Sequence, residues 1–298
     1  MKTLRLGPAG AERIALVAYA WSALFLLVPL ALVLKLSLSD IALAIPPYAP
    51  RLDWGGGLDG LRRFLAALDG EAYVRLAGDR VYLDAFLSSL GYAVAATALL
   101  LLIGYPMALA MARAPERLRP ILVGAVAVPF WTSLLIRTYA WIAILRPEGW
   151  LNMLGAKLGL EPVSLLHTDA AVYIGLVYAY LPFMVLPLYA ALERQDEALL
   201  EAAADLGAAA WTAFWTVTFP MSLPAVFGAA LLCLIPITGE FVIPDLLGGS
   251  STLMAGKLIW TEFFGNRDWP TASAAGMVLI LLLAGPILLQ QRLGERRA

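Results

Sequence analysis

The reactions open to this chain are limited by how few reactive side chains it carries. Its 298 residues include one cysteine, Cys233, and one histidine, His167. A lone cysteine excludes an internal disulfide framework and a multi-cysteine metal site, so we interpret Cys233 as a packing residue and His167 as a surface residue. The sequence has no Gly-x-x-x-x-Gly-Lys-Ser/Thr loop for nucleotide phosphates. We therefore expect neither an intramembrane enzyme nor an ATPase, and no cofactor or metal ion on this chain.

Two charged residues stand within long apolar runs, where a charge is costly and is by default a functional candidate. Glu240 falls near the outer end of an expected span over 220–243. Its carboxylate either passes an ammonium group along a solute path or pairs with a donor at the helix end. Arg137 falls in the outer half of an expected span over 121–145. For Arg137 we favour a structural role, by snorkelling outward or by pairing with an acid such as Glu240, over gating the path or meeting an anion.

Aromatic residues accompany these charges and allow two interpretations. Aromatic rings hold ammonium groups through cation–π contacts, and they also form the belts that anchor spans at the membrane surface. Both interpretations apply to Trp131, Tyr139, Trp141, Tyr178 and Tyr180. Together with Glu240, the candidate residues of a solute path are Trp131, Tyr139 and Tyr180.

The composition places the chain in a lipid bilayer. It is 61% hydrophobic and 14% charged, whereas a soluble domain carries about 25% charged residues. The net charge of −1 gives no reason to expect a nucleic acid partner. A span needs about 20 apolar residues, and backbone groups in lipid require it to be a helix. We predict an all-α membrane protein with six transmembrane helices over residues 14–36, 85–112, 121–145, 170–192, 220–243 and 271–290.

The basic residues of the short loops predict that both ends of the chain lie inside, because lysine and arginine accumulate in cytoplasmic loops. Lys2, Arg5 and Arg13, the arginines of 113–119 and those of 292–297 all fall on that side. The apolar run after Arg13 is longer than the 7–15 residues of a signal-peptide core. We therefore expect an uncleaved first span.

Residues 39–84 form the one sizeable loop that is expected outside. Prolines at 46–47 and glycines at 55–57 indicate irregular chain. Residues 58–68 then predict a short amphipathic helix. The loop is either a lid over the helix ends or a platform for an outside partner.

Residues 201–220, EAAADLGAAAWTAFWTVTFP, lie between two expected spans and predict a helix–turn–helix. Asp196 is a good N-cap for the first helix, and Gly207 suits the left-handed position that ends it. A second short helix can begin near Ala208 and run into Pro220, which opens the next span. This second helix carries an aromatic stripe of Trp211, Phe214 and Trp215.

The charge of this inner loop indicates what covers it. A single arginine, Arg194, faces five acids, which are Glu193, Asp196, Glu197, Glu201 and Asp205. A small-residue helix with an acidic edge and an aromatic stripe suits a groove on another protein. A helix lying on the lipid surface is the alternative, but such helices usually carry lysine and arginine on the polar face. We favour docking on a protein.

At this point the sequence resembles a known family, the permease subunits of ABC importers. These subunits share an EAA loop: Glu-Ala-Ala, a glycine after three residues, and an apolar pair with proline further on. The matching residues here are Glu201, Ala202, Ala203, Gly207, Val217, Phe219 and Pro220. The family more often has isoleucine and leucine where Val217 and Phe219 stand, a departure that keeps the apolar character.

The resemblance covers nearly the whole chain. Residues 103–106, 129–141, 180–189 and 239–249 are similar to permeases of the spermidine/putrescine type. The resemblance implies a type-1 ABC importer permease fold in a single integral membrane domain. Its parts would be a first span over 14–36, a periplasmic loop over 39–84, a five-helix permease core over 85–290 and a cytoplasmic coupling loop over 196–219.

The same resemblance implies a role and partners. The chain would be a subunit of the bacterial inner membrane that carries polyamines or a related small organic solute. Besides lipid, its partners would be a second permease, an ABC ATPase dimer that uses the ATP, and a periplasmic solute-binding protein. The positions implied for ATPase docking are Glu201, Ala202, Ala203, Asp205, Leu206, Gly207 and Trp211.

A self-sufficient secondary transporter is the competing function. Such transporters often have inverted repeats and polar midplane residues on broken helices. The sequence has no clear repeat, and its predicted spans hold few charges. We therefore favour an importer subunit that takes its energy from elsewhere.

Overall fold

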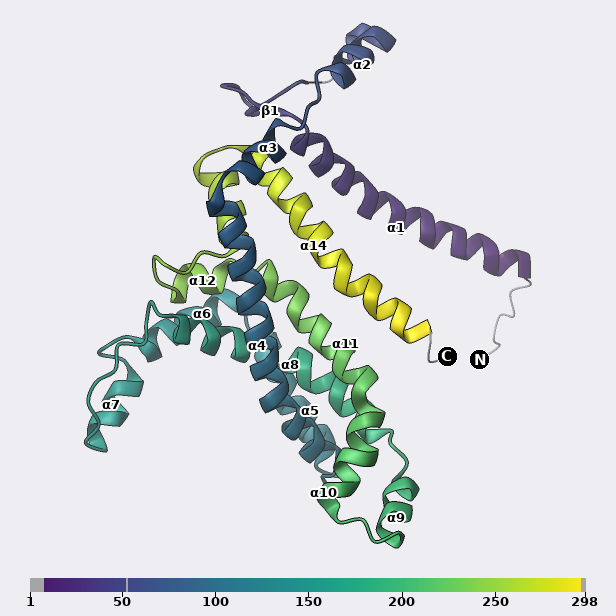
Figure 1. Ribbon diagram of the computed structural model, residues 1–298, viewed down its shortest axis with the longest axis vertical. Coiled ribbons are helices and arrows are strands. Elements are labelled where there is room, and N and C mark those ends of the chain that lie inside the picture. Colours follow the sequence, from purple (N-terminus) through teal and green to yellow (C-terminus); the bar gives the residue numbers. More distant parts are fainter. Residues whose placement is uncertain (1–7, 52, 296–298) are drawn as a thin grey trace. The chain divides into compact units, whose positions relative to one another are not determined.

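The computed structural model describes residues 8–51 and 53–295 of the chain (Figure 1). Helices make up nearly all of the described regular structure, as predicted for an all-α membrane protein, and the described strands have two residues each. The chain divides into two compact units. The first unit is built from residues up to 80 and from 259–280, and the second from 81–258 and from 281 onward.

The first unit begins with the apolar helix α1 (Pro8–Ser37), which contains the predicted span 14–36. Helix α2 confirms the amphipathic helix predicted over 58–68, whereas the two strands and α3 are not evident from the sequence pattern. After α1 come β1 (Asp40–Ile41), the antiparallel β2 (Tyr48–Ala49), the 3-10 turn η1 (Trp54–Gly56), α2 (Gly57–Ala66) and α3 (Glu71–Gly78). The unit also includes the π-helical turn η4 (Thr261–Gly265) and the first turns of α14 (Trp269–Glu295).

Polar contacts fasten these short elements to the end of α1. The Tyr73 hydroxyl donates to Ser37 Oγ at 2.7 Å, and the Asp69 amide donates to the Leu38 carbonyl at 3.0 Å. The ammonium group of Lys35 lies 3.6 Å from the ring centroid of Tyr48, a cation–π contact. The predicted outer loop is therefore a folded connection.

The second unit is a helical bundle around α8 (Asp169–Glu193), which packs most extensively against α11 (Phe219–Thr238). The elements before α8 are α4 (Arg80–Ala112), α5 (Arg119–Ala127), the 3-10 turn η2 (Val128–Trp131), α6 (Leu134–Leu145) and α7 (Trp150–Lys157). Those after it are α9 (Glu197–Asp205), α10 (Ala210–Ala213), the π-helical turn η3 (Phe214–Thr218), α11, α12 (Val242–Leu247) and α13 (Ala255–Trp260).

The core of this bundle lies along α8. Leu176 and Met184 of α8 are fully buried, as are Cys233 and Ile237 of α11, so Cys233 is the packing residue that the sequence predicts. Helix α4 contributes small buried side chains, which let neighbouring helices approach closely. These are Ala93, Ala96 and Ala108.

The third predicted span, 121–145, is not one straight helix. The chain bends by 92° between Arg119–Trp131 and Leu134–Lys157. Thr132 and Ser133 adopt extended conformations, with ψ of 148° and 141°, which interrupt the helix. By length and composition, five helices of the described chain can cross a membrane, or six if the bent pair is one span.

The fifth predicted span, 220–243, is wrong at its C-terminal end. Helix α11 ends at Thr238, and a new helix, α12, begins at Val242. Gly239 follows the last helical residue, and the carboxylate of Glu240 accepts the Phe241 and Val242 amides that the break exposes. Apolar content therefore continues through a point where the backbone changes direction.

A glycine of α8 provides a test of this packing. A Cβ atom at Gly175 would lie 2.6 Å from Leu247 Cδ1 and 2.9 Å from Ile243 Cγ2 of α12. We predict that Gly175→Ala lowers the free energy of unfolding by about 1–3 kcal/mol, because overpacking displaces α12. Thermal unfolding of the purified protein measures this change. The matched variant is Gly91→Ala in α4, where nothing lies within 4 Å, and equal destabilisation of both variants would contradict the close approach of α8 and α12.

Candidate functional site

The first candidate site is the coupling elbow, residues 196–218, which contains α9, α10 and η3. The Asp196 side chain accepts the Ala198 amide at 3.0 Å, which confirms its predicted capping role. At the other end of α9, the Gly207 amide donates to Ala204 O at 2.8 Å and the Ala208 amide donates to Ala203 O at 3.0 Å. This pair of bonds is a Schellman motif. It requires the left-handed φ of +80° that Gly207 adopts, as the sequence predicts.

The elbow exposes most of its side chains. Helix α9 contains no buried residue. Leu206 is 89% exposed and Trp211 is 70% exposed, although both are apolar. The structure brings the seven candidate docking residues together on this one elbow: Glu201, Ala202, Ala203, Asp205, Leu206, Gly207 and Trp211. An exposed, largely uncharged ridge beside acidic residues has the chemistry of a contact surface.

The second helix of the elbow does not stop before Pro220. Residues Ala210–Thr238 form one continuous helical stretch, and the π-helical turn η3 lies within it. The Phe214 ring stacks on Trp211 with centroids 5.8 Å apart and meets Tyr105 of α4 edge-on, also at 5.8 Å. The predicted aromatic stripe therefore joins the elbow to the bundle, and Pro220 lies in the first turn of α11.

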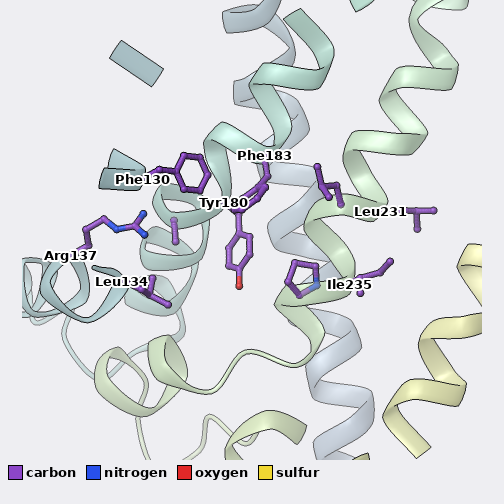
Figure 2. A pocket seen from close by; sticks show the side chains of 10 residues that line it. Phe130, Leu134, Arg137, Tyr180, Phe183, Leu231 and Ile235 are labelled. Carbon is purple, nitrogen blue, oxygen red and sulfur yellow. The ribbon is translucent and has the colours of Figure 1, made fainter. Parts of the chain in front are cut away.

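The second candidate site is a cavity of about 450 Å³ among α6, α8, η2 and α11 (Figure 2). Its wall is aromatic and aliphatic, and the guanidinium of Arg137 is its one charged group. The aromatic lining residues that the sequence pattern does not single out are Phe130 and Phe183, whose rings meet edge-on with centroids 4.8 Å apart. Each follows a proline, at 129 and 182, and lies in one of the segments that resemble the permease family, but neither feature predicts that the two rings meet. The lining residues are Phe130, Leu134, Arg137, Ala179, Tyr180, Phe183, Leu231, Leu232, Ile235 and Pro236.

Glu240 lies beside this cavity but is already occupied by donors. It is 8% exposed. The Tyr180 hydroxyl donates to its Oε2 at 2.7 Å, and the amides of Phe241 and Val242 donate to its Oε1 at 3.1 and 2.9 Å. The carboxylate thus caps the start of α12 and links this helix to α8. A carboxylate held in this way has little capacity left for a passing ammonium group.

Arg137 does not pair with Glu240. No ion pair joins these two described residues. The Nε and Nη1 atoms of Arg137 are buried and have no hydrogen-bond partner, and Figure 2 shows the guanidinium beside the cavity. The predicted pairing of Arg137 with this acid is therefore wrong for the chain by itself.

Of the other candidates for a solute path, only Tyr180 lines the cavity. Trp131 and Tyr139 are 85% and 58% exposed and are not among its lining residues. Their exposure on apolar helices also fits an anchoring role at the membrane surface. His167 lies in a turn, where its amide donates to Leu247 O at 2.9 Å.

Comparisons with known proteins identify relatives of this chain. Residues 101–297 match the family described as "Binding-protein-dependent transport system inner membrane component". The chain is 38% identical over 270 residues to the spermidine/putrescine transport system permease protein PotB of Haemophilus influenzae, covering 90% of this chain and 88% of that protein. It is 40% identical over 222 residues to PotB of Escherichia coli, covering 74% and 80%.

A solved structure shows the same fold. It is a bacterial ABC transporter involved in the import of the acidic polysaccharide alginate, in which a chain aligns with a TM-score of 0.67 and 18% identity. The alignment covers 96% of this chain and 95% of that one. At this identity the likeness concerns the fold alone.

The Glu240 contacts lead to a prediction about stability. Glu240→Leu should lower the free energy of unfolding by about 2–4 kcal/mol, because the Tyr180 hydroxyl and two backbone amides lose their acceptor. Glu240→Gln keeps a carbonyl oxygen of the same reach and should cost clearly less. Thermal unfolding of the two purified variants checks the order. If leucine were as stable as glutamine, the carboxylate would not be the cap of α12.

Proposed function

Because the chain belongs to the family of binding-protein-dependent transport system inner membrane components, and is thus a permease subunit of an ABC importer, we propose that it forms half of the translocation pathway for polyamines such as spermidine and putrescine. The observation that carries the proposal is the 38% identity to a spermidine/putrescine permease across 90% of the chain. Subunits of this family are non-catalytic, multi-pass proteins of the bacterial inner membrane.

The cavity supports a passage better than a selective polyamine site. Its aromatic walls suit a cation, but the guanidinium of Arg137 repels one, and Glu240 is bonded to three donors. We therefore assign the choice of solute chiefly to a periplasmic binding protein. The cavity beside Tyr180 is then part of the path along which the solute passes. Arg137 is then a structural or gating residue, and the acceptor for its Nε and Nη1 donors comes from outside this chain.

The proposed topology has six spans and both ends of the chain inside. It counts the bent pair at 119–157 as the third span and α1, α4, α8, α11 and α14 as the others. The support is the positive-inside rule, with Arg113 and Arg117 in the loop between α4 and α5 and Arg119 at the start of α5. In this topology the coupling elbow faces the cytoplasm and residues 39–79 face the periplasm.

The proposed partners follow from the two faces that this topology exposes, one to the cytoplasm and one to the periplasm. An ABC ATPase dimer binds the coupling elbow and uses the ATP, so this chain needs no cofactor. A second, homologous permease completes the passage, and the binding protein delivers solute from the periplasm. Exposed Leu206 and Trp211, beside the acidic edge of α9, are the residues that suit a groove on the ATPase.

Docking is tested at Leu206. We predict that Leu206→Asp leaves the membrane fold intact, because the side chain is 89% exposed, but reduces co-purification with the ATPase at least about tenfold, since a charge in an apolar contact costs more than about 1.4 kcal/mol. Leu158→Asp is the matched control, at another leucine that is 78% exposed. Unchanged co-purification of the Leu206 variant would place the ATPase contact elsewhere.

The solute is tested by transport. Proteoliposomes that contain this chain, its partner subunits and the binding protein should take up radiolabelled spermidine or putrescine only when ATP is supplied on the ATPase side. Equal uptake by this chain alone, driven by an ion gradient, would support a secondary transporter instead. ATP-dependent uptake of another solute, with none of either polyamine, would keep the importer and overturn the polyamine assignment.

A further inference from the structure

One side-chain hydrogen bond closes the coupling elbow at its base. Gln195, the residue just before the elbow, donates from Nε2 to the backbone carbonyl of Thr218 at 3.0 Å. Gln195 is half-buried and Thr218 is buried. The bond joins two points that are 23 residues apart in the sequence, after the end of α8 and just before α11. It therefore turns an open connection into a closed one.

Apart from the helix that follows it, little else holds α9 against the bundle. No residue of α9 is buried, and its main contacts are with α10 and η3, which follow it in the chain. A short helix takes most of its stability from a packed apolar face, and the apolar face of α9 is at most half-buried inside this chain, at Leu200 and Ala203. Without the bond from Gln195, a force on α9 can bend the connection at 194–196 without moving the bundle.

The first of the two points that Gln195 joins is fixed by charge. The carboxylate of Glu193, at the end of α8, accepts the Tyr189 hydroxyl at 2.6 Å and pairs with Arg119 at 3.4 Å. The Arg119 Nε also donates to the Ala114 carbonyl at 2.9 Å. The end of α8 is thus tied to the start of α5, two residues before Gln195.

The second point is fixed by packing. The Tyr105 hydroxyl of α4 shares a buried hydrogen bond of 2.9 Å with Ser222 of α11. The ring of Tyr105 also meets Phe214 and Phe219 on either side of Thr218, with centroids 5.8 and 5.7 Å apart. A small polar cavity of about 80 Å³ lies at this base and is lined by Gln195 and Thr218 among others. One end of the elbow therefore starts from an ion-paired helix end, and the other from a packed part of the bundle.

We propose that Gln195 is a positioning residue that clamps the two ends of the coupling elbow, so that a displacement of α9 moves α8 and α11 together. The inference rests on the proposed docking of the elbow on the ATPase. It adds to that proposal the element that makes the elbow stiff. The clamp is a single donor on a backbone acceptor, so it can be removed without changing either the docking surface or the bundle core.

The clamp is tested by distance measurements between spin labels in the full chain. In a Cys233→Ala background, labels at 204 of α9 and 227 of α11 report the elbow against the bundle; both positions are exposed. With Gln195 present we expect one narrow distance distribution, in the chain alone and in the complex with and without trapped ATP. Gln195→Leu should raise the population of displaced elbows about fivefold, the effect of losing one hydrogen bond of about 1 kcal/mol.

Further variants separate the clamp from a general structural role. Gln195→Glu keeps the length but lacks the donor and should behave like leucine, whereas Gln195→Arg restores a donor and should narrow the distribution again. Arg194→Leu, at the exposed neighbouring residue, should leave it unchanged. A narrow distribution in both Gln195→Leu and Gln195→Glu would overturn the inference, as would a broad one in the chain that keeps Gln195.

Co-purification with the ATPase distinguishes the two proposals. The Gln195 variants should still bind the ATPase, because the exposed face of the elbow is unchanged. If they lose it while Leu206→Asp retains it, the bond serves docking and not transmission, and the clamp is overturned. If the chain with Gln195 never binds the ATPase, the docking proposal fails, while the distance measurement on the chain alone still decides the clamp.

Discussion

Inside lipid every backbone amide and carbonyl needs a partner from the protein, and this constraint decides where the helices of this chain can break. The break between α11 and α12 is possible because the Glu240 carboxylate accepts the two amides that it exposes. The other oxygen of Glu240 is held by Tyr180 of α8. The cap therefore depends on the packing of α8 against α11, and the position of α12 depends on the cap.

The two candidate sites differ in their chemistry. The cavity beside Tyr180 has apolar walls, and the Nε and Nη1 atoms of its one guanidinium have no hydrogen-bond partner within the described chain. The coupling elbow is built from an N-cap, a Schellman motif and aromatic contacts, and few of its side chains are buried. The cavity thus contains hydrogen-bond donors without partners. The elbow has its helix ends capped and leaves its side chains exposed to a partner.

Local signals accounted for the coupling elbow, whereas the cavity required the fold. Asp196 and Gly207 act on amides and carbonyls within a few residues, so their roles are evident from spacing alone. Phe130 and Phe183 come together because the packing of the bundle places η2, just before the 92° bend, beside α8. Apolar content is the same on both sides of that bend, which is why hydropathy predicted one straight span over 121–145.

The sequence by itself determined that the chain is a helical membrane protein, that it has the elbow, and which family it belongs to. Composition, capping residues and the EAA spacing can be seen without knowing how the helices pack. Only the tertiary structure decided that Glu240 is an acceptor for three donors and that Gln195 reaches Thr218. Contacts between residues 23 or 60 positions apart depend on how α8 and α11 pack. That packing is set by shape and by neighbouring side chains, which no periodicity in the sequence records.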